Sequence, residues 1–144
     1  TYNKAIIKYR NDKIRRSPLI VGFPNALLQS FGIKNKAIYL DYEVIKKATL
    51  NKHWLKIDDF ISLGRKINNP IAIFNSLSHK TTSKIILIDV VDSLKRRVIV
   101  ILRLDNRNQI SITSIYGKNS KQQLLEWEKR GLLLFKDKKK WDYL

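Results

Sequence analysis

The chain has 144 residues, of which 29 are Lys or Arg and 12 are Asp or Glu, so its formal net charge at pH 7 is +17. This length and a hydrophobic content of 44% fit one domain with one buried core and argue against two full domains. The absence of cysteine excludes a disulfide framework and a thiolate zinc site.

The positive charge predicts a polyanionic partner, because each phosphate that Lys or Arg neutralises releases condensed counterions. Nucleic acid is the favoured partner, and an anionic membrane or an acidic protein is an alternative. Composition bias from an AT-rich genome is a third explanation, although it accounts for the many lysines better than for the few acidic residues. No apolar run reaches the ~18 residues of a membrane span, and no signal peptide is visible, so no membrane span is expected. Because the chain begins at Thr1 and lacks methionine, we expect a domain cut from a longer protein. The sequence then shows no localisation signal from which the location of the protein could be inferred.

Helices are expected mainly in the first half of the chain. Residues 1–16 carry six basic side chains without a sustained period, and we interpret them as a basic N-terminal arm or loose helix that precedes a single domain over 17–144. Proline and glycine bracket the next apolar stretch, and aspartates occupy N-cap positions. The predicted elements are a short helix over 26–31 that Gly32 ends, a strand over 37–40, a helix over 42–53 capped by Asp41 and a helix over 59–67 capped by Asp58.

The second half has the period of strands. Runs rich in Ile and Val predict strands over 71–74, 84–91, 97–104 and 109–116, connected by short polar turns. Ser120 has the spacing of a capping box for a helix that Gly131 ends, followed by a strand over 132–135 and a basic tail over 136–140. The order predicts an α+β fold, in which N-terminal helices pack on a four- to five-stranded antiparallel sheet with one late inserted helix.

Alternation along 109–116 predicts which side chains share a face of the sheet. Strict alternation places Ile110, Ile112, Ser114 and Tyr116 together, so that the two polar residues continue a buried row. Two polar side chains at the end of such a row, just before Gly117, indicate a place where a cleft can open.

Three residues are the main candidates for catalysis, and a fourth is a weaker one. His53 ends a predicted helix, and the ordinary pKa of histidine suits acid–base chemistry near neutral pH. Alternatively, His53 only favours the C-terminal dipole of that helix. Ser114 and Tyr116 are candidate partners in metal-free RNA cleavage, although such residues in strands usually pack across the sheet. His79, in a loop rich in Ser and Thr, is a weaker candidate.

Phosphate contacts come from basic and hydroxyl side chains. The candidate substrate-binding residues are Lys52, Lys84, Arg103, Thr113 and Lys118. Trp141 follows three lysines and is a candidate for stacking on bases, against the alternative of a solvated terminus. With two imidazoles and no tight carboxylate cluster, we expect no metal site and no cofactor.

The order of several motifs resembles a known superfamily. It is similar to the phage nuclease domains of the barnase, EndoU, tRNA-cutting colicin and RelE superfamily, which occur at the C-termini of MuF-type phage proteins and of large polyvalent proteins. The similarity extends from about Ser17 to Lys138. The motifs are Ser17-Pro18, Val21-Gly22, Pro24-Asn25, Asn51-Lys52-His53, Asn69 to Ser76, Thr113 to Lys118 and Trp127 to Phe135.

The resemblance implies a metal-independent RNase that acts on tRNA or another structured RNA, often as a toxin with an acidic immunity protein as partner. It implies action in the cytoplasm of a target or host bacterium, as the C-terminal part of a larger secreted or phage protein. The family's Lys-His pair corresponds to Lys52 and His53, and its Ser-x-Tyr motif to Ser114 and Tyr116. Phe135 departs from the Tyr that related chains tend to have, which weakens a catalytic role for its strand.

Two functions without chemistry stay open at this point. The first is a basic nucleic-acid-binding module, whose affinity would fall steeply with salt without any cleavage. The second is a domain whose basic face docks an acidic immunity protein.

Overall fold

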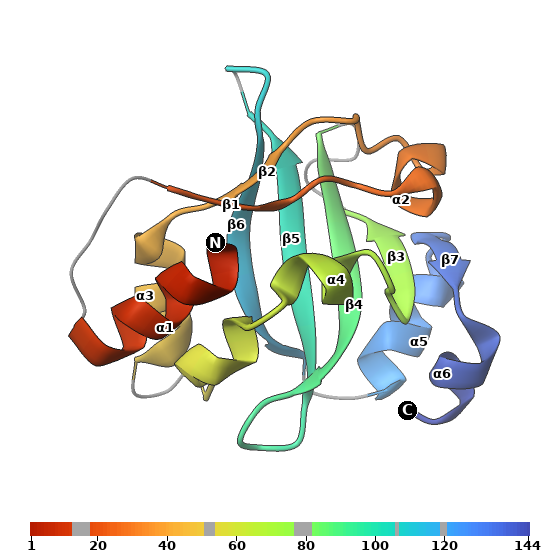
Figure 1. Cartoon of the computed structure of the whole chain (residues 1–144). Coiled ribbons are helices and arrows are strands. Elements are labelled where there is room, and N and C mark those ends of the chain that lie inside the picture. The colour runs from red at the N-terminus through yellow and green to blue at the C-terminus, as the bar shows by residue number, and fades with distance from the viewer. Residues whose placement is uncertain (13–17, 51–53, 77–81, 106, 119–120) are drawn as a thin grey trace.

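The computed structural model describes residues 1–12, 18–50, 54–76, 82–105, 107–118 and 121–144. It confirms the α+β fold with N-terminal helices packed against a sheet (Figure 1). The α-helices are α1 (Tyr2–Asp12), α2 (Ala26–Ser30), α3 (Tyr42–Thr49), α4 (Leu63–Ile67), α5 (Lys121–Lys129) and α6 (Lys138–Asp142), and Ile57–Phe60 form the 3-10 helix η2. The strands are β1 (Leu19–Gly22), β2 (Ile38–Leu40), β3 (Ala72–Asn75), β4 (Ser83–Val91), β5 (Arg97–Leu104), β6 (Ile110–Lys118) and β7 (Leu133–Lys136).

The strands form a seven-stranded sheet in the order β1-β2-β6-β5-β4-β3-β7, more than the four or five strands expected. The predicted meander β4-β5-β6 lies at its centre, and every neighbouring pair is antiparallel except β2 and β6. The parallel pair is short, since Ile38 and Tyr39 of β2 pair only with Ile110 and Ser111. Most of β6 therefore has no strand on its outer side among the described residues.

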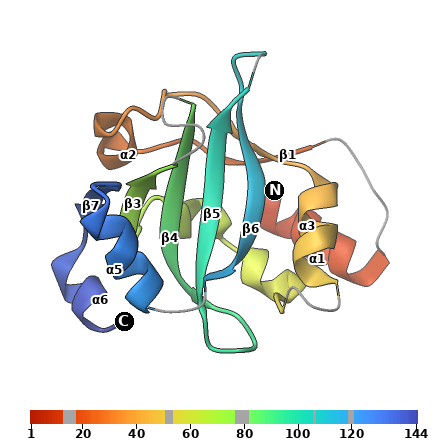
Figure 2. The ribbon, with the colours of Figure 1, turned by 180° about the vertical axis from the view of Figure 1, so that it is seen from behind.

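Helices cover both faces of the sheet. On one side, α1, α3 and α4 pack with a core cluster that includes Ile45, Ile86 and Val100 (Figure 1). On the other side, α5 and α6 lie over β3 and β4 and bury a second cluster that includes Phe74 and Leu124 (Figure 2). No described helix is long and apolar enough to cross a membrane.

The N-terminal segment forms a helix, one of the two forms expected for it, and this helix contributes to the core. Residues Tyr2–Asp12 form α1, which buries Ile6 and Tyr9 on one side and exposes its basic residues. The Tyr2 hydroxyl donates a hydrogen bond of 2.9 Å to the Phe60 carbonyl. Tyr2, Ile6 and Tyr9 are spaced four and three residues apart, which places them on one face of the helix.

The prediction of one continuous helix over 59–67 is wrong, because this part of the chain is divided between η2 and α4. Ser62, at the division, adopts a left-handed conformation with φ of 54°. Its backbone N–H donates to Asn3 Oδ1 of α1, a long-range contact that local sequence cannot reveal. The caps Asp41 and Gly32 are confirmed, since Asp41 accepts from Glu43 N and Gly32 has φ of +92° at the end of α2. The Ser120 cap lies outside the described residues.

The stacking role predicted for Trp141 is wrong. Asp137 caps a short helix, α6, and turns Trp141 into the second core cluster, where only 4% of it is exposed. Its ring lies 6.2 Å from that of Phe74. A buried indole that packs on a core phenylalanine is not available to a base.

Candidate nucleic-acid-cleaving site

A cleft of about 330 Å³ lies between α3 and the outer edge of β6. It exists because β2 pairs only with the start of β6, so that helix α3 rather than another strand flanks the remainder (Figure 2). We call it the α3–β6 cleft. Its lining residues are Val44, Lys47 and Ala48 of α3, Arg96 of the β4–β5 turn, and Thr113 to Gly117 of β6.

A β-bulge at Thr113 determines which β6 side chains face which way. Ile112 pairs with Leu102 and Ser114 with Ile101, so Thr113 is an extra residue and is exposed. The predicted single row is therefore wrong, since the alternation reverses at the bulge. Ile112 and Ile115 join the first core cluster, whereas Tyr116 packs against the second. Ser114 does not continue the buried row of Ile110 and Ile112.

Ser114 and Tyr116 are both half-buried in the cleft. Burial raises the pKa of the Tyr116 phenol above its ordinary value, because desolvation disfavours the phenolate. At neutral pH Tyr116 is a neutral hydroxyl, as tyrosine ordinarily is, and it can donate a hydrogen bond.

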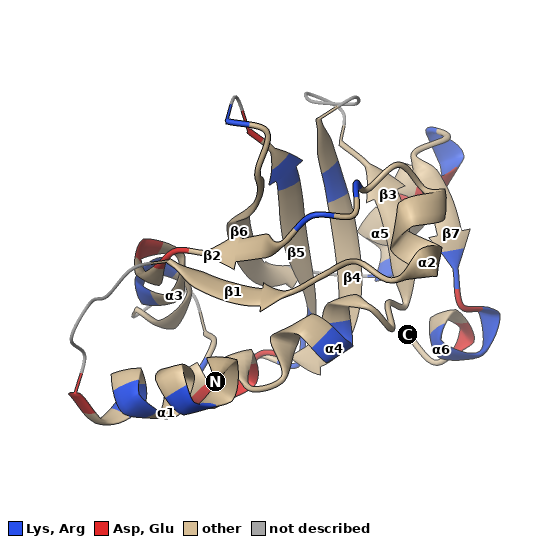
Figure 3. Cartoon of the chain, turned by 45° about the horizontal axis from the view of Figure 1, so that its top comes forward, with Lys and Arg blue, Asp and Glu red and all other residues tan. Residues whose placement is uncertain are grey.

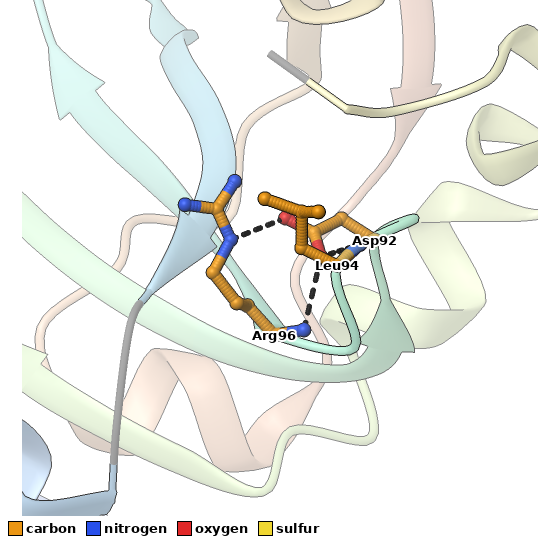
Figure 4. A network of polar contacts seen from close by, with 3 residues as sticks. All are labelled: Asp92, Leu94 and Arg96. Atoms are coloured by element: carbon orange, nitrogen blue, oxygen red, sulfur yellow. Dashed lines mark hydrogen bonds and ion pairs between the residues drawn. The ribbon is translucent and has the colours of Figure 1, made fainter. Parts of the chain in front are cut away.

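The first of two cationic side chains in the cleft is Arg96, and a buried carboxylate positions it (Figure 4). Arg96 Nε donates to Asp92 Oδ2 at 2.7 Å, and the Asp92 side chain is fully buried. The other carboxylate oxygen accepts from the backbone N–H groups of Leu94 and Arg96, both at 2.9 Å. Asp92 thus shapes the β4–β5 turn and orients the guanidinium. Three hydrogen bonds compensate its burial.

The second cation, Lys47, comes from α3. Asp41 caps this helix, and the buried residues Ile45 and Ala48 fix its rotation against the sheet. Lys47 lies one residue before Ala48 and is exposed where the helix borders the cleft. Among the described residues that line the cleft, Arg96 and Lys47 are the charged ones and none is acidic.

The structure brings only some of the sequence-predicted site residues together. Ser114, Tyr116 and Thr113 line the α3–β6 cleft. Lys84 and Arg103 do not, because they lie at the opposite end of β4 and β5. Lys52, His53 and His79 lie outside the described residues. Lys118 ends β6, and its side chain is outside the description.

Sequence reasoning missed Arg96 and Lys47. An Asp at the start of a tight turn with an Arg four residues later is a signal that could have indicated Arg96, because such an Asp often accepts backbone N–H bonds across the turn. For Lys47 the signal is weaker, since its helix contains several lysines. Within the described part of the chain, no group of three or more His, Cys, Asp or Glu side chains could hold a metal ion.

Comparison with known proteins identifies one family. No curated protein and no solved structure matches the chain. The sequence matches the phage MuF C-terminal domain over residues 44–143. This range begins in α3 and contains every residue that lines the α3–β6 cleft. The match covers more than half of the chain, which therefore belongs to the phage MuF C-terminal domain family.

Proposed function

We propose that this domain is a metal-independent RNA endonuclease. In this proposal the α3–β6 cleft holds the phosphate at which the RNA strand is cut. One observation carries the proposal. A guanidinium and an ammonium, from Arg96 and Lys47, border the same hollow as the hydroxyl residues Ser114 and Tyr116. Cations attract the phosphodiester, and hydroxyls can donate to its oxygens.

Cleavage of RNA without a metal requires two proton transfers. The 2′-oxygen loses its proton and forms a bond to phosphorus, while the bond from phosphorus to the 5′-oxygen breaks and that oxygen takes a proton. Negative charge accumulates on the two non-bridging oxygens in the transition state. Arg96 would stabilise this charge, since Asp92 orients its guanidinium before the substrate arrives.

The two proton-transfer roles fall to Tyr116 and His53 in this proposal. The phenol of Tyr116 is protonated at neutral pH, as that of tyrosine ordinarily is, so it can donate to the 5′-oxygen or to a phosphate oxygen. The base is then His53. In the sequence His53 directly precedes Trp54, whose carbonyl accepts from Ser93 N in the turn that also carries Arg96.

The wider charge of the chain supports the same substrate class. A net charge of +17 favours a polyanion, and tRNA or another structured RNA is the proposed substrate. A toxin of this kind would be held inactive by an acidic immunity protein. Such an inhibitor would gain affinity by covering Lys47 and Arg96.

Incubation of the purified domain with total bacterial RNA and EDTA tests the proposal on a denaturing gel. The wild type is compared with His53→Ala and Tyr116→Phe, after circular dichroism has shown that each variant is folded. We expect discrete fragments from the wild type and a strong loss in both variants. Intact RNA in every lane would refute cleavage and would favour the binding or inhibitor-docking function.

A further inference from the structure

A second basic pocket lies at the other end of the central strands. Lys34, Lys84 and Arg103 border it together with Thr82, and none of the described residues that line it is acidic. Figure 3 shows the corresponding Lys and Arg segments where β4 and β5 meet the connection between α2 and β2. We call it the distal pocket. Its volume is about 80 Å³, and the described residues that line it are Gly32, Ile33, Lys34, Thr82, Lys84, Leu102, Arg103, Leu104 and Ile110.

Lys84 is the unusual residue of this pocket. It lies directly across the sheet from Leu102, in a half-buried position at the start of β4. Desolvation lowers the pKa of its ammonium below the ordinary lysine value. Lys34 borders the same small pocket, so an anion placed there would stabilise both ammonium groups at once. Arg103 lies at the rim, because its pairing with Ser111 places it on the opposite face of the sheet from Lys84.

We propose that the distal pocket is a second phosphate-binding site, which holds the backbone of an RNA strand several nucleotides away from the α3–β6 cleft. The inference rests on the proposed function for its choice of ligand. A pocket of ~80 Å³ with two lysines, and with Arg103 at its rim, matches one phosphate group better than a base or a nucleoside.

The sheet itself connects the two sites. Arg103 pairs with Ser111, Ile101 with Ser114 and Ile99 with Tyr116, and paired residues share a face of the sheet. This face of β5 and β6 is the part that α5 and α6 leave uncovered among the described elements (Figure 2). A strand of RNA lying along it would contact hydroxyl side chains between the α3–β6 cleft and Arg103, which lies at the rim of the distal pocket.

The separation of the two sites predicts a substrate length. Six residue steps along β5 separate Arg97, next to Arg96, from Arg103, which corresponds to ~20 Å at about 3.3 Å per residue. A stacked strand advances about 3.4 Å per nucleotide, so roughly six nucleotides bridge the two sites. Shorter oligonucleotides can occupy only one of them.

Binding of uncleavable RNA tests the proposal independently of catalysis. Fluorescence anisotropy with 2′-O-methyl oligonucleotides of about three, six and twelve nucleotides measures Kd for the wild type and for the double variant Lys34→Gln/Lys84→Gln. The matched control is Lys4→Gln/Lys8→Gln, which removes the same charge from exposed positions of α1. Lys84→Arg keeps the positive charge. Comparison with this variant therefore separates the effect of losing the charge from an effect of the substitution on folding.

We expect the wild type to bind the two longer oligonucleotides more tightly than the shortest one. The distal double variant should reduce this ratio and make the slope of log Kd against log salt shallower by about 1.4, the value for two lost contacts to a single strand. The α1 control and Lys84→Arg should retain the wild-type ratio.

Equal losses of RNA affinity in the distal variant and in the α1 control would overturn the proposal, because they would show only an effect of net charge. Competition by a polyglutamate peptide as effective as that by RNA would also overturn it and would assign the pocket to an acidic protein. Because the oligonucleotides cannot be cleaved, a length-dependent Kd that the distal variant loses would support this site even if the domain cuts no RNA.

Discussion

The backbone of Gly117 packs directly against the Asp92 carboxylate. A Cβ atom at Gly117 would lie 2.1 Å from Asp92 Oδ2 and 3.1 Å from Arg96 Cβ. Only glycine allows the end of β6 to approach the β4–β5 turn this closely. The contact therefore holds the turn that carries Arg96 against the strand that carries Ser114 and Tyr116.

We predict that Gly117→Ala destabilises the domain and impairs its cleft together. The added methyl group must displace the carboxylate, which disturbs its three hydrogen bonds and moves the guanidinium. Overpacking of this kind costs about 1–3 kcal/mol. Urea denaturation measures the loss, and RNA affinity measures the effect on the cleft. A variant with wild-type stability would show that the turn and β6 are not held together as described.

Replacement of Arg96 tests how much its ion pair with Asp92 stabilises the folded domain. Arg96→Met leaves the fully buried Asp92 carboxylate without its guanidinium, so we expect a loss of about 3 kcal/mol in the free energy of unfolding. Adding Asp92→Asn removes the unpaired charge and should recover part of that loss. A double-mutant cycle from denaturation curves measures the coupling. Strictly additive losses would contradict a stabilising pair.

The bulge in β6 shows why the sequence predicted the strand but not its faces. The alternating residues of 109–116 indicate a strand, and the structure has one at Ile110–Lys118. The extra residue, Thr113, is an ordinary strand former. The residues around it give no sequence signal of a bulge. A single inserted residue reverses every later side chain, so the face of Ser114 and Tyr116 depends on pairing with β5.

The pH dependence of stability should report the buried phenol of Tyr2. Desolvation and, secondly, the neighbouring Tyr42 raise the pKa of Tyr2 far above its ordinary value of about 10. In the unfolded chain the phenol ionises near that ordinary value, while the folded chain keeps its proton. The contribution is therefore fully present below about pH 10 and is lost as the pH rises beyond it.

Comparison of the wild type with Tyr2→Phe isolates this effect. The variant loses the hydrogen bond to the Phe60 carbonyl, so it should be less stable by about 1 kcal/mol at neutral pH. Between about pH 10 and 11 the wild type should lose stability faster than the variant, as measured by urea denaturation. Parallel curves for the two proteins would contradict a shifted pKa at Tyr2.

Removal of the Tyr116 hydroxyl should impair cleavage much more than binding. Tyr116→Phe keeps the ring that packs against the second core cluster, so we expect a folded protein with nearly wild-type affinity for uncleavable RNA. Loss of a proton donor lowers kcat by about 100-fold or more. Single-turnover kinetics on a defined RNA measure the change. An unaltered rate would remove Tyr116 from the reaction.

The candidate site was partly visible in the sequence. The Ser-x-Tyr motif located β6 as a lining strand, and the turn over 92–96 was recognised as charged. Arg96 could not be assigned to the cleft, because its direction depends on the buried Asp92 and on the close approach of Gly117. Lys84 and Arg103 resembled contacts for the same phosphate, yet strand direction places them at the far end of the sheet.

Two adjacent lysines of α3 provide the most direct test that the α3–β6 cleft is where RNA is cut. Lys47 lines the cleft, whereas its exposed neighbour Lys46 lines a different hollow with Tyr9 and Leu55. Lys47→Gln and Lys46→Gln remove the same charge from the same helix. We predict that kcat/KM for a defined RNA in EDTA falls about tenfold or more in Lys47→Gln, as expected for loss of a charged phosphate contact, and little in Lys46→Gln. Equal effects of the two substitutions would contradict a reaction site in this cleft.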